Sequence, residues 1–179
     1  MKQTVNAFDY ASHICNEMGR GILLTTKKDD FVNTMTIGWG TIGIEWGKPV
    51  FIAFVRESRY TKVMLEENVE FTVNIPYGEV DSGILGFCGT KSGRDMNKIS
   101  EAGLTLEEPS RISVPGIKEL PLTLECRVLY TQKQDLNALP KAILDRYYPS
   151  NPSCPYAGSD RDSHYAYYAE IVDAYLITE

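Results

Sequence analysis

The chain has 179 residues, of which 43% are hydrophobic and 23% charged, so it is long enough for one domain with a full core, and its composition excludes a disordered chain. Its formal net charge is −6 and no basic block stands out, which argues against nucleic acid or an anionic membrane as a partner. Residues 1–21 lack the apolar stretch of a signal peptide and no membrane-spanning run follows, so we expect a cytoplasmic protein.

The first predicted element is a helix that ends at Gly19, a natural stop residue. Two strands follow, at residues 21–26 and 31–37, with a polar turn between them. The run 50–55 is entirely apolar and rich in β-branched and aromatic residues, which is typical of a strand buried on both faces. The residues at helical spacing that would form the apolar face of the first helix are Phe8, Ala11, Ile14, Cys15 and Met18.

The rest of the chain also divides into short helices and strands. Residues 69–75 alternate between apolar and polar side chains, which predicts a strand with one buried face. Residues 149–163 are rich in Pro, Ser, Asp and Gly and predict a loop, either mobile or lid-like. The other predicted elements are helices at 60–67, in two pieces within 79–102 and at 136–147, and strands at 122–130 and 167–177.

Five or six short strands, mostly joined by hairpins, favour a closed antiparallel sheet with helices packed outside it. We therefore predict a mainly β fold with flanking helices (α+β), a small barrel in a single domain over residues 1–179. The segment Gly38–Gly43 matches the G-x-G-x-x-G pattern, but Ile44–Pro49 cannot supply the helix that a dinucleotide site requires. We expect these glycines to form a tight bend or a backbone-lined platform beside a flat ligand.

The most informative segment is Arg56–Thr61, where the apolar strand 50–55 is followed directly by the helix 60–67. It contains two arginines and two hydroxyl groups. Free N–H groups and the helix dipole favour an anion at a helix N-terminus, and arginines can clamp the oxygens of that anion. A phosphate site is one interpretation, and a solvated turn with a Ser or Thr cap is the other.

Other chemical motifs are weaker. The four cysteines are far apart, which predicts free thiols and no structural metal. The segment Gly86–Ser92 resembles a phosphate loop only superficially, and no Gly-x-Ser-x-Gly accompanies the two histidines, His13 and His164. His164, beside several tyrosines, is either a structural hydrogen-bonding residue or a catalytic one. Trp39 is either a core residue or an aromatic beside a bound ring.

A set of segments in a fixed order carries a family resemblance that covers about residues 18–175. They are Gly21–Thr26, Asn33–Trp39, Arg56–Thr61, Glu70–Pro76, Ser92–Lys98, and His164 ahead of Ala169–Val172. Together they resemble the flavin reductase-like, FMN-binding split-barrel family, which includes the flavoredoxins. Two departures bear on the subfamily and the electron donor. They are Asn97 and Ile99, where the family often has Asp and an aromatic, and Gly47–Pro49 in place of Asp-Pro-Pro.

The resemblance implies an antiparallel split β-barrel of the FMN-binding type and a set of residues around FMN. His164 and the loop 149–163 would cover the flavin face that nicotinamide approaches, with His164 as the candidate catalytic residue. The implied cofactor-binding residues are Arg56, Ser58, Arg59, Tyr60 and Thr61 around the phosphate, Met35, Thr36 and Trp39 at the ring edge, and Cys88, Gly89, Lys91, Ser92 and Lys98 on the other side.

The resemblance also implies a function, an FMN-dependent oxidoreductase that takes hydride from NADH or NADPH and passes electrons to a further acceptor. The alternative is a non-enzymatic FMN electron carrier that docks to a redox protein. A third interpretation is a split barrel with another phosphate-bearing or planar ligand, such as pyridoxal phosphate or haem. Relatives in the family are commonly homodimers with flavin near the interface, so we expect a homodimer whose further partner is a redox protein or a small-molecule acceptor.

Overall fold

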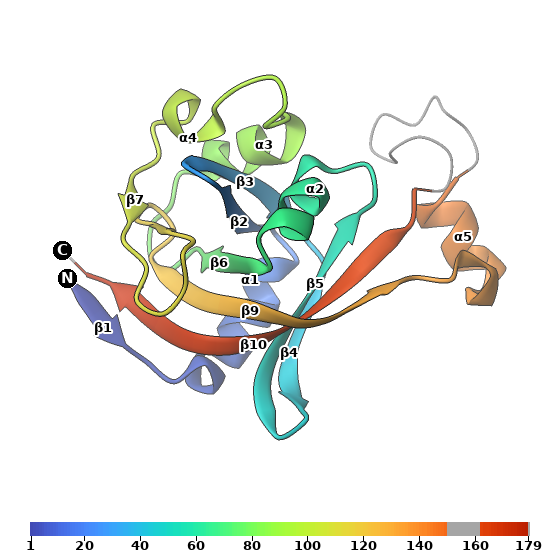
Figure 1. Ribbon diagram of the computed structural model, residues 1–179, viewed down its shortest axis with the longest axis horizontal. Coiled ribbons are helices and arrows are strands. Elements are labelled where there is room, and N and C mark those ends of the chain that lie inside the picture. The colour runs from blue at the N-terminus through green and yellow to red at the C-terminus, as the bar shows by residue number, and fades with distance from the viewer. Residues whose placement is uncertain (150–161, 179) are drawn as a thin grey trace.

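The computed structural model describes residues 1–149 and 162–178. Its main feature is a large curled sheet with the two chain ends side by side at one end (Figure 1). A small two-stranded sheet, β7 (Leu106–Glu107) and β8 (Gly116–Ile117), lies next to it. The strands of the main sheet are β1 (Lys2–Thr4), β2 (Ile22–Lys28), β3 (Phe31–Ile37), β4 (Gly40–Glu45), β5 (Lys48–Arg56), β6 (Glu70–Ile75), β9 (Leu122–Lys133) and β10 (His164–Ile177).

Short helices cover parts of this sheet. α3 and α4 pack on β3, α2 packs on β2, and α1 packs on β4 and β6. None of the helices in the described part of the chain has the length and apolar character needed to cross a membrane. The helices are η1 (Ala7–Tyr10), α1 (Ala11–Met18), α2 (Tyr60–Glu67), α3 (Ser82–Thr90), α4 (Lys98–Glu101), η2 (Leu136–Ala138) and α5 (Lys141–Tyr147).

The main sheet is antiparallel throughout, with the strand order β3-β2-β6-β9-β10-β5-β4. β10 is the central strand, because it pairs with β9 along its length, with β5 in its first half and with β1 at its end. Its register with β9 shifts between Tyr168 and Ala169 and again between Ile171 and Asp173, and such bulges increase the bend and twist of a strand. The predicted mainly antiparallel fold with flanking helices is confirmed.

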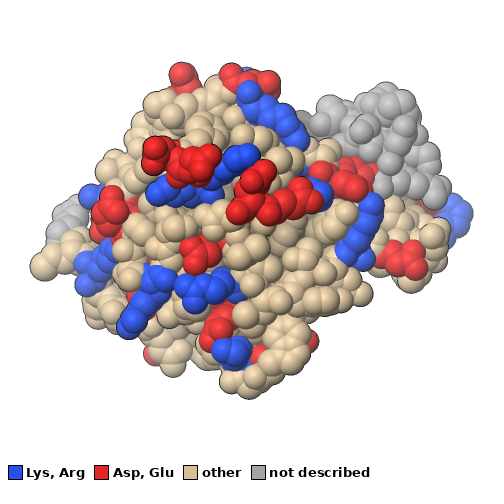
Figure 2. Space-filling model, in the orientation of Figure 1, with Lys and Arg blue, Asp and Glu red and all other residues tan. Residues whose placement is uncertain are grey.

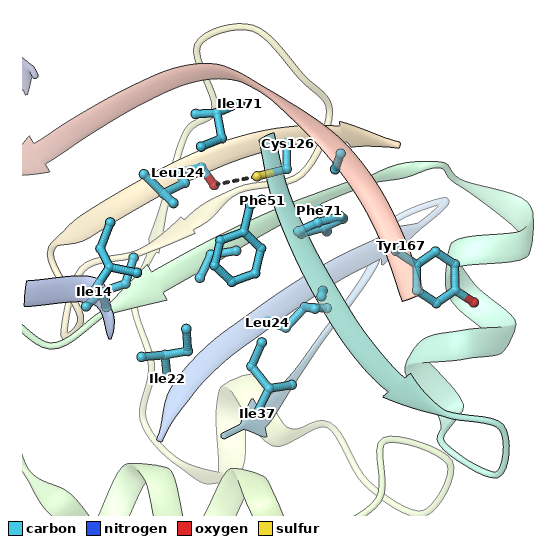
Figure 3. Packing of buried hydrophobic residues seen from close by; sticks show 14 of the residues in the cluster. Ile14, Ile22, Leu24, Ile37, Phe51, Phe71, Leu124, Cys126, Tyr167 and Ile171 are labelled. Atoms are coloured by element: carbon cyan, nitrogen blue, oxygen red, sulfur yellow. Dashed lines mark hydrogen bonds between the residues drawn. The ribbon is translucent and has the colours of Figure 1, made fainter. Parts of the chain in front are cut away.

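The inner side of the curled sheet encloses the main hydrophobic core. Phe51 of β5 and Phe71 of β6 are fully buried at its centre (Figure 3). Ile14 and Met18 of α1 pack into the same cluster. Burying an aromatic or aliphatic side chain of this size contributes roughly 1.5–3 kcal/mol, so this core is the main source of stability. Other members of the cluster are Ile22, Leu24, Ile37, Val55, Leu124, Cys126, Tyr167 and Ile171.

The strand predicted over residues 69–75 is buried on both faces, so the expectation of a half-buried strand was wrong. The polar face of β6 is covered by the segment around β8, and its groups are paired there. Thr72 Oγ1 donates to the carbonyl of Pro115 at 2.8 Å, and Ile117 N–H donates to Asn74 Oδ1 at 2.8 Å. A polar side chain can be buried without a large cost when it has a hydrogen-bond partner. Because Thr72 and Asn74 have such partners, this face of β6 does not have to be exposed to water.

Three further expectations are corrected. For the glycine segment 38–43 the tight bend was wrong, because residues 40–45 form β4, which pairs with β5, whereas the alternative of a backbone-lined platform beside a flat ligand stays a prediction. Gly40 allows a close approach there, since a Cβ on it would lie 2.9 Å from Phe51 Cζ. The main sheet of the described chain has eight strands rather than five or six. Phe8 and Cys15 are exposed rather than part of the apolar face of the first helix: Phe8 lies in η1, before α1 begins, and Cys15 lies on the solvent side of α1, next to the buried Ile14.

Strand 50–55 was predicted to be buried on both faces, and this holds for only one of them. Phe51, Ala53 and Val55 are fully buried, whereas Ile52 and Phe54 are half-buried. On this outer face, Phe54 instead lines a cavity.

Most of the predicted loop 149–163, including Cys154, lies outside the described residues, and its role stays a prediction. Within the described residues, Cys15, Cys88 and Cys126 are free thiols. Acidic and basic side chains are interspersed over the face shown in Figure 2. The cytoplasmic location likewise stays a prediction.

The main core predicts a large difference between two leucines of the same strand. Leu124 is fully buried and Leu129 is 43% exposed, both in β9. We expect Leu124→Ala to lower the free energy of unfolding by about 2–5 kcal/mol, because it leaves a cavity in the core. The control Leu129→Ala should cost below about 1 kcal/mol. Urea denaturation of both variants measures the difference, and equal losses would contradict this core assignment.

Candidate functional site

Two adjoining cavities lie where β3, β5 and α2 meet. Their volumes are about 200 Å³ and 170 Å³, and they share Met35, Thr36 and Arg59 as walls. Together they reach the roughly 300–1,000 Å³ typical of small-molecule sites. The larger, which we call the cationic cavity, is lined by Asn33, Met35, Thr36, Ser58, Arg59, Tyr60, Thr61, Cys88, Gly89, Lys91, Ser92, Gly93, Arg94 and Lys98. The smaller, the aromatic cavity, is lined by Met35, Thr36, Ile37, Gly38, Trp39, Phe54, Arg56, Arg59 and His164.

The cationic cavity lies at the start of α2. Arg59 is the N-cap residue, in an extended conformation, and its side chain makes no capping hydrogen bond. The first N–H groups of a helix have no partner within the helix, and the helix dipole adds partial positive charge there. The buried Thr61 in the first turn accepts a hydrogen bond from Asn33 Nδ2 at 3.3 Å. The local sequence therefore presents uncapped helix donors to a cavity, which is the arrangement that favours an anion.

Charge is distributed unequally in this cavity. Lys98 is buried in its floor, and Arg59, Lys91 and Arg94 are exposed at its rim. Among the described residues that line it there is no carboxylate, so four cations face the same space. Like charges so close together repel one another unless an anion lies between them. The cavity therefore has the electrostatic character of a site for a multiply charged anion.

Lys98 is held by the C-terminal end of α3. Its Nζ donates to the carbonyl of Cys88 at 3.0 Å and to that of Lys91 at 3.2 Å. Burial is the main cause that lowers the pKa of Lys98 to about 8; the Cys88 thiol opposes this shift and Arg59 adds to it. Burial also raises the pKa of the Cys88 thiol. Lys98 is thus still largely charged at neutral pH, and an anion in the cavity would stabilise that charge.

Ser58 and Arg56 are positioned by the segment just before β10. The N–H of Ser58 donates to Asp162 Oδ1 at 3.0 Å, and its hydroxyl donates to Asp162 Oδ2. Arg56 donates to the carbonyls of Asp162 and Tyr147, both at 3.0 Å. Arg56 was also predicted around a phosphate, but it lines the aromatic cavity instead. The predicted phosphate residues that line the cationic cavity are Ser58, Arg59, Tyr60 and Thr61.

Aromatic rings define the smaller cavity. The ring centroid of Trp39 lies 4.8 Å from that of His164 and 5.2 Å from that of Tyr147. The guanidinium of Arg56 lies 5.2 Å from the centroid of the Tyr148 ring. Trp39 is partly exposed, so the interpretation of it as a core residue was wrong. A flat aromatic ligand would meet ring surfaces here, with which it can stack.

His164 is a buried hydrogen-bonding residue in this structure. Its Nδ1 lies 2.7 Å from the hydroxyl of Tyr148. Burial is the main cause that lowers its pKa to about 4, with Arg56 and Arg59 adding to the effect. The ring is therefore neutral near pH 7. These contacts agree with the structural interpretation of His164, and its catalytic role stays a prediction.

All thirteen residues predicted to bind a cofactor, together with His164, line at least one of the two cavities. Sequence reasoning did not assign Asn33, Gly93, Arg94 or Asp162 to the site. Asn33 and the Ser-Gly-Arg-Asp run were visible as part of the resemblance, but nothing local marks their side chains as cavity walls. The need for glycine at position 93 comes from a contact with a residue far away in the sequence. A Cβ on Gly93 would lie 2.1 Å from Asn33 Oδ1.

One buried atom indicates what kind of ligand fits. Asn33 Oδ1 is buried and has no hydrogen-bond partner among the described residues. A buried acceptor without a donor is costly, and a ligand hydroxyl would satisfy it. The cavities thus combine cations and helix donors for a phosphate, an acceptor for a hydroxyl, and ring surfaces for a flat aromatic system. These residues fit FMN, which carries a phosphate, hydroxyl groups and a flat ring system.

A third and larger cavity, of about 500 Å³, lies beside the other two. It is lined by His13 and Glu17 of α1, by Arg20 just after that helix, by α3 and the segment before it, and by Thr36. Thr36 therefore forms part of the wall of all three cavities, and its hydroxyl donates to the carbonyl of Leu85 at 2.6 Å.

A curled antiparallel sheet with adjoining cationic and aromatic cavities is the architecture of a small-ligand-binding barrel. Comparison with known proteins defines it further. Residues 17–179 match the model of the flavin reductase like domain. The chain therefore belongs to the flavin reductase like domain family, which confirms the family resemblance seen in the sequence.

Three similar proteins illustrate the relationship. An uncharacterised protein of Archaeoglobus fulgidus is 35% identical over 97 residues, 54% of each chain, so the match spans about half the length of that relative. The flavoredoxin of Methanosarcina acetivorans is 26% identical with a TM-score of 0.61, over 88% of this chain and 68% of that one. An FMN-binding domain of a flavin reductases-like enzyme from Shewanella baltica is 15% identical with a TM-score of 0.64, over 98% and 77%. The likeness to this domain, and to the split barrel domain of a Shewanella frigidimarina protein that is 17% identical with a TM-score of 0.64, establishes the split-barrel fold.

The shifted pKa of His164 predicts a specific dependence of stability on pH. The unfolded chain protonates this histidine near its ordinary pKa of roughly 6.5, whereas the folded chain does so near 4. Between these values the unfolded state binds more protons, so the folded state loses stability as the pH falls. We expect this group to cost about 2–3 kcal/mol between pH 7 and pH 4.5, and His164→Gln to remove that loss. Urea denaturation at each pH measures it, and parallel profiles for the two proteins would contradict it.

Proposed function

We propose that this protein binds FMN and acts as an oxidoreductase that takes hydride from NADH or NADPH and passes electrons to a further acceptor. The observation that carries the proposal is the cationic cavity at the start of α2, joined through Met35, Thr36 and Arg59 to the aromatic cavity. Membership of the flavin reductase-like family supports the same ligand. When bound, FMN supplies the capacity to accept hydride and to release electrons singly or in pairs.

Different residues of this chain would bind the different parts of FMN. Arg59, Lys98 and the first N–H groups of α2 would hold the phosphate, because they are the donors and charges that face the cationic cavity. Asn33 Oδ1 would accept a hydrogen bond from a ribityl hydroxyl. Trp39 and the neutral His164 would border the ring and exclude water from one side of it. Positive charge from Arg56 near the ring would favour the anionic reduced form of the cofactor.

A direct experiment tests the proposal. The purified protein is titrated with FMN and followed by flavin absorbance and fluorescence, and then mixed anaerobically with NADH or NADPH. Binding of FMN followed by rapid bleaching of the flavin supports the reductase. A protein that is colourless as purified and does not bind FMN would exclude the proposal, and absorbance bands of another chromophore would indicate a different ligand.

The second candidate function is a non-enzymatic electron carrier. It is supported by similarity to the flavoredoxin of Methanosarcina acetivorans, which is 26% identical over most of this chain. The same anaerobic mixing separates the two. A carrier would bind FMN and be reduced by a redox protein or by dithionite, but neither nicotinamide nucleotide would bleach it.

Arg59 provides a quantitative test of the phosphate end. We expect Arg59→Ala to weaken FMN binding by about 2–3 kcal/mol, roughly 30- to 150-fold, because a charge-assisted hydrogen bond is lost. The matched control is Arg111→Ala, which removes the same charge from the loop before β8, away from both cavities. Fluorescence titration with FMN measures both variants. Equal affinity in Arg59→Ala and Arg111→Ala would remove Arg59 from the phosphate site.

We further propose that the protein is a homodimer and that the tip of the β4–β5 hairpin contributes to its interface. This hairpin projects beyond the rest of the sheet (Figure 1). Ile44, Trp46 and Tyr130 are 66%, 55% and 48% exposed, and Trp46 and Tyr130 contact each other and Tyr168 through their rings. Trp46 also has a positive φ of 52°, an unfavourable conformation for a bulky residue. Clustered exposed aromatic residues are typical of an interface.

The dimer predicts a change of mass in solution. We expect the wild-type protein to sediment as a dimer and Trp46→Glu to shift it toward the monomer, because a charge would be buried at the interface. Leu106→Glu is the control, since Leu106 is an exposed apolar residue of β7, away from the hairpin. Analytical ultracentrifugation measures the three proteins, and a monomeric wild type would contradict the proposal.

A further inference from the structure

The segment between α3 and α4 forms one wall of the cationic cavity. Its turn is held by two hydrogen bonds, from Arg94 N–H to Ser92 Oγ at 3.2 Å and from Asp95 N–H to the Ser92 carbonyl at 3.1 Å. Gly93 is buried against Asn33 on the neighbouring strand β3. Gly93 and Asn33 pack so closely that no Cβ would fit between them. This contact holds the wall against β3.

Arg94 extends from this wall to the opposite one. Its Nη1 donates to the carbonyl of Ser58 at 3.0 Å, and its guanidinium lies 5.3 Å from the centroid of the Tyr60 ring. Ser58 and Tyr60 belong to the turn that begins α2. Gly93 is buried whereas Arg94 and Ser58 are exposed, so this bridge lies at the outer rim of the cavity rather than in its floor. We call it the Arg94 bridge.

The position of the bridge matters for the two common flavin nucleotides. In FMN the phosphate is the end of the molecule, with two negative charges and three free oxygens. In FAD one of these oxygens continues into a second phosphate and an adenosine, which must leave the cavity across its rim. A planar guanidinium held by a carbonyl and an aromatic ring crosses that rim, and its remaining N–H groups are donors for a terminal phosphate.

We propose that the Arg94 bridge makes this site selective for a flavin monophosphate over a flavin dinucleotide. The inference rests on the proposed binding of FMN and goes beyond it, because it names the residue that decides between two ligands with the same ring. Selectivity here has two contributions. The Arg94 bridge obstructs the path of the longer ligand across the rim, and its free N–H groups attract the terminal phosphate of the shorter one. Charge alone would not give it, since both nucleotides bring negative phosphates to the same cations.

The experiment compares FMN, FAD and riboflavin in parallel titrations monitored by flavin fluorescence. We expect the wild-type protein to bind FMN at least about tenfold more tightly than FAD. Arg94→Ala should weaken FMN binding and leave FAD binding unchanged or tighter, so that the ratio of the two affinities falls at least about tenfold. Arg94→Lys keeps the charge but cannot bond Ser58 and cover Tyr60 with one planar group, so the ratio should also fall. Arg111→Ala is the matched control and should keep the wild-type ratio.

The possible outcomes separate the two proposals. If Arg94→Ala lowers the affinities for FMN and FAD by the same factor, Arg94 contributes only charge, and the proposed selectivity is overturned. Equal affinity of the wild-type protein for FMN and FAD would overturn it as well, while leaving flavin binding intact. A wild-type protein that binds none of the three flavins would overturn the proposed function itself. Urea denaturation of Arg94→Ala verifies that the exposed substitution leaves the fold intact.

Discussion

The antiparallel register between β5 and β10 is the constraint on which the site depends. In this ladder His164 lies opposite Arg56, and the pairing continues to Glu170 opposite Val50. Because successive side chains of a strand point to opposite faces, a slip of one residue would move the cavity residues to the wrong side. The buried residues Phe51, Ala53 and Val55 prevent this slip, since it would expose them. The hydrophobic core therefore sets the position of the polar site through the sheet.

The cationic cavity contains an arrangement of charges that is unfavourable in the absence of a ligand. The whole chain carries a net charge of −6, yet four cations share one small space that no described carboxylate lines. The floor is held rigidly, with Lys98 on two backbone carbonyls, whereas the rim residues are exposed and screened by solvent. Such an arrangement places its unfavourable repulsion where a ligand anion can relieve it, and local rules of stability are often broken at functional sites for this reason.

Local patterns predicted much of the fold. The strand Phe31–Ile37 and the helix Tyr60–Glu67 have the bounds that periodicity indicated, because their apolar spacing and their end residues agree. β4 was not predicted, since its glycines hide the alternation and its partner β5 decides its structure. The burial of Thr72 and Asn74 could not be inferred either, because their partners come from residues some forty positions away.

The site was predictable to the extent that its residues are neighbours in sequence. The segment Arg56–Thr61 already showed a strand that leads into a helix, and the structure places a cavity there. Arg56 lines only the aromatic cavity whereas Arg59 lines both, and the position of Arg56 depends on Asp162 and Tyr147, which hold it through their carbonyl groups. Asn33 and Arg94 act through contacts across the fold, to Thr61 and Ser58, which no local pattern specifies.

The contact between Gly93 and Asn33 also has an evolutionary consequence. Any side chain at position 93 would place its Cβ 2.1 Å from Asn33 Oδ1, far inside the sum of the atomic radii. A substitution at this glycine therefore requires that the Asn33 side chain move, that residue 33 become smaller or that the wall move outward. In an alignment of relatives, positions 33 and 93 should accordingly vary together, sixty residues apart, and mark the chains in which this wall of the cavity has been rebuilt.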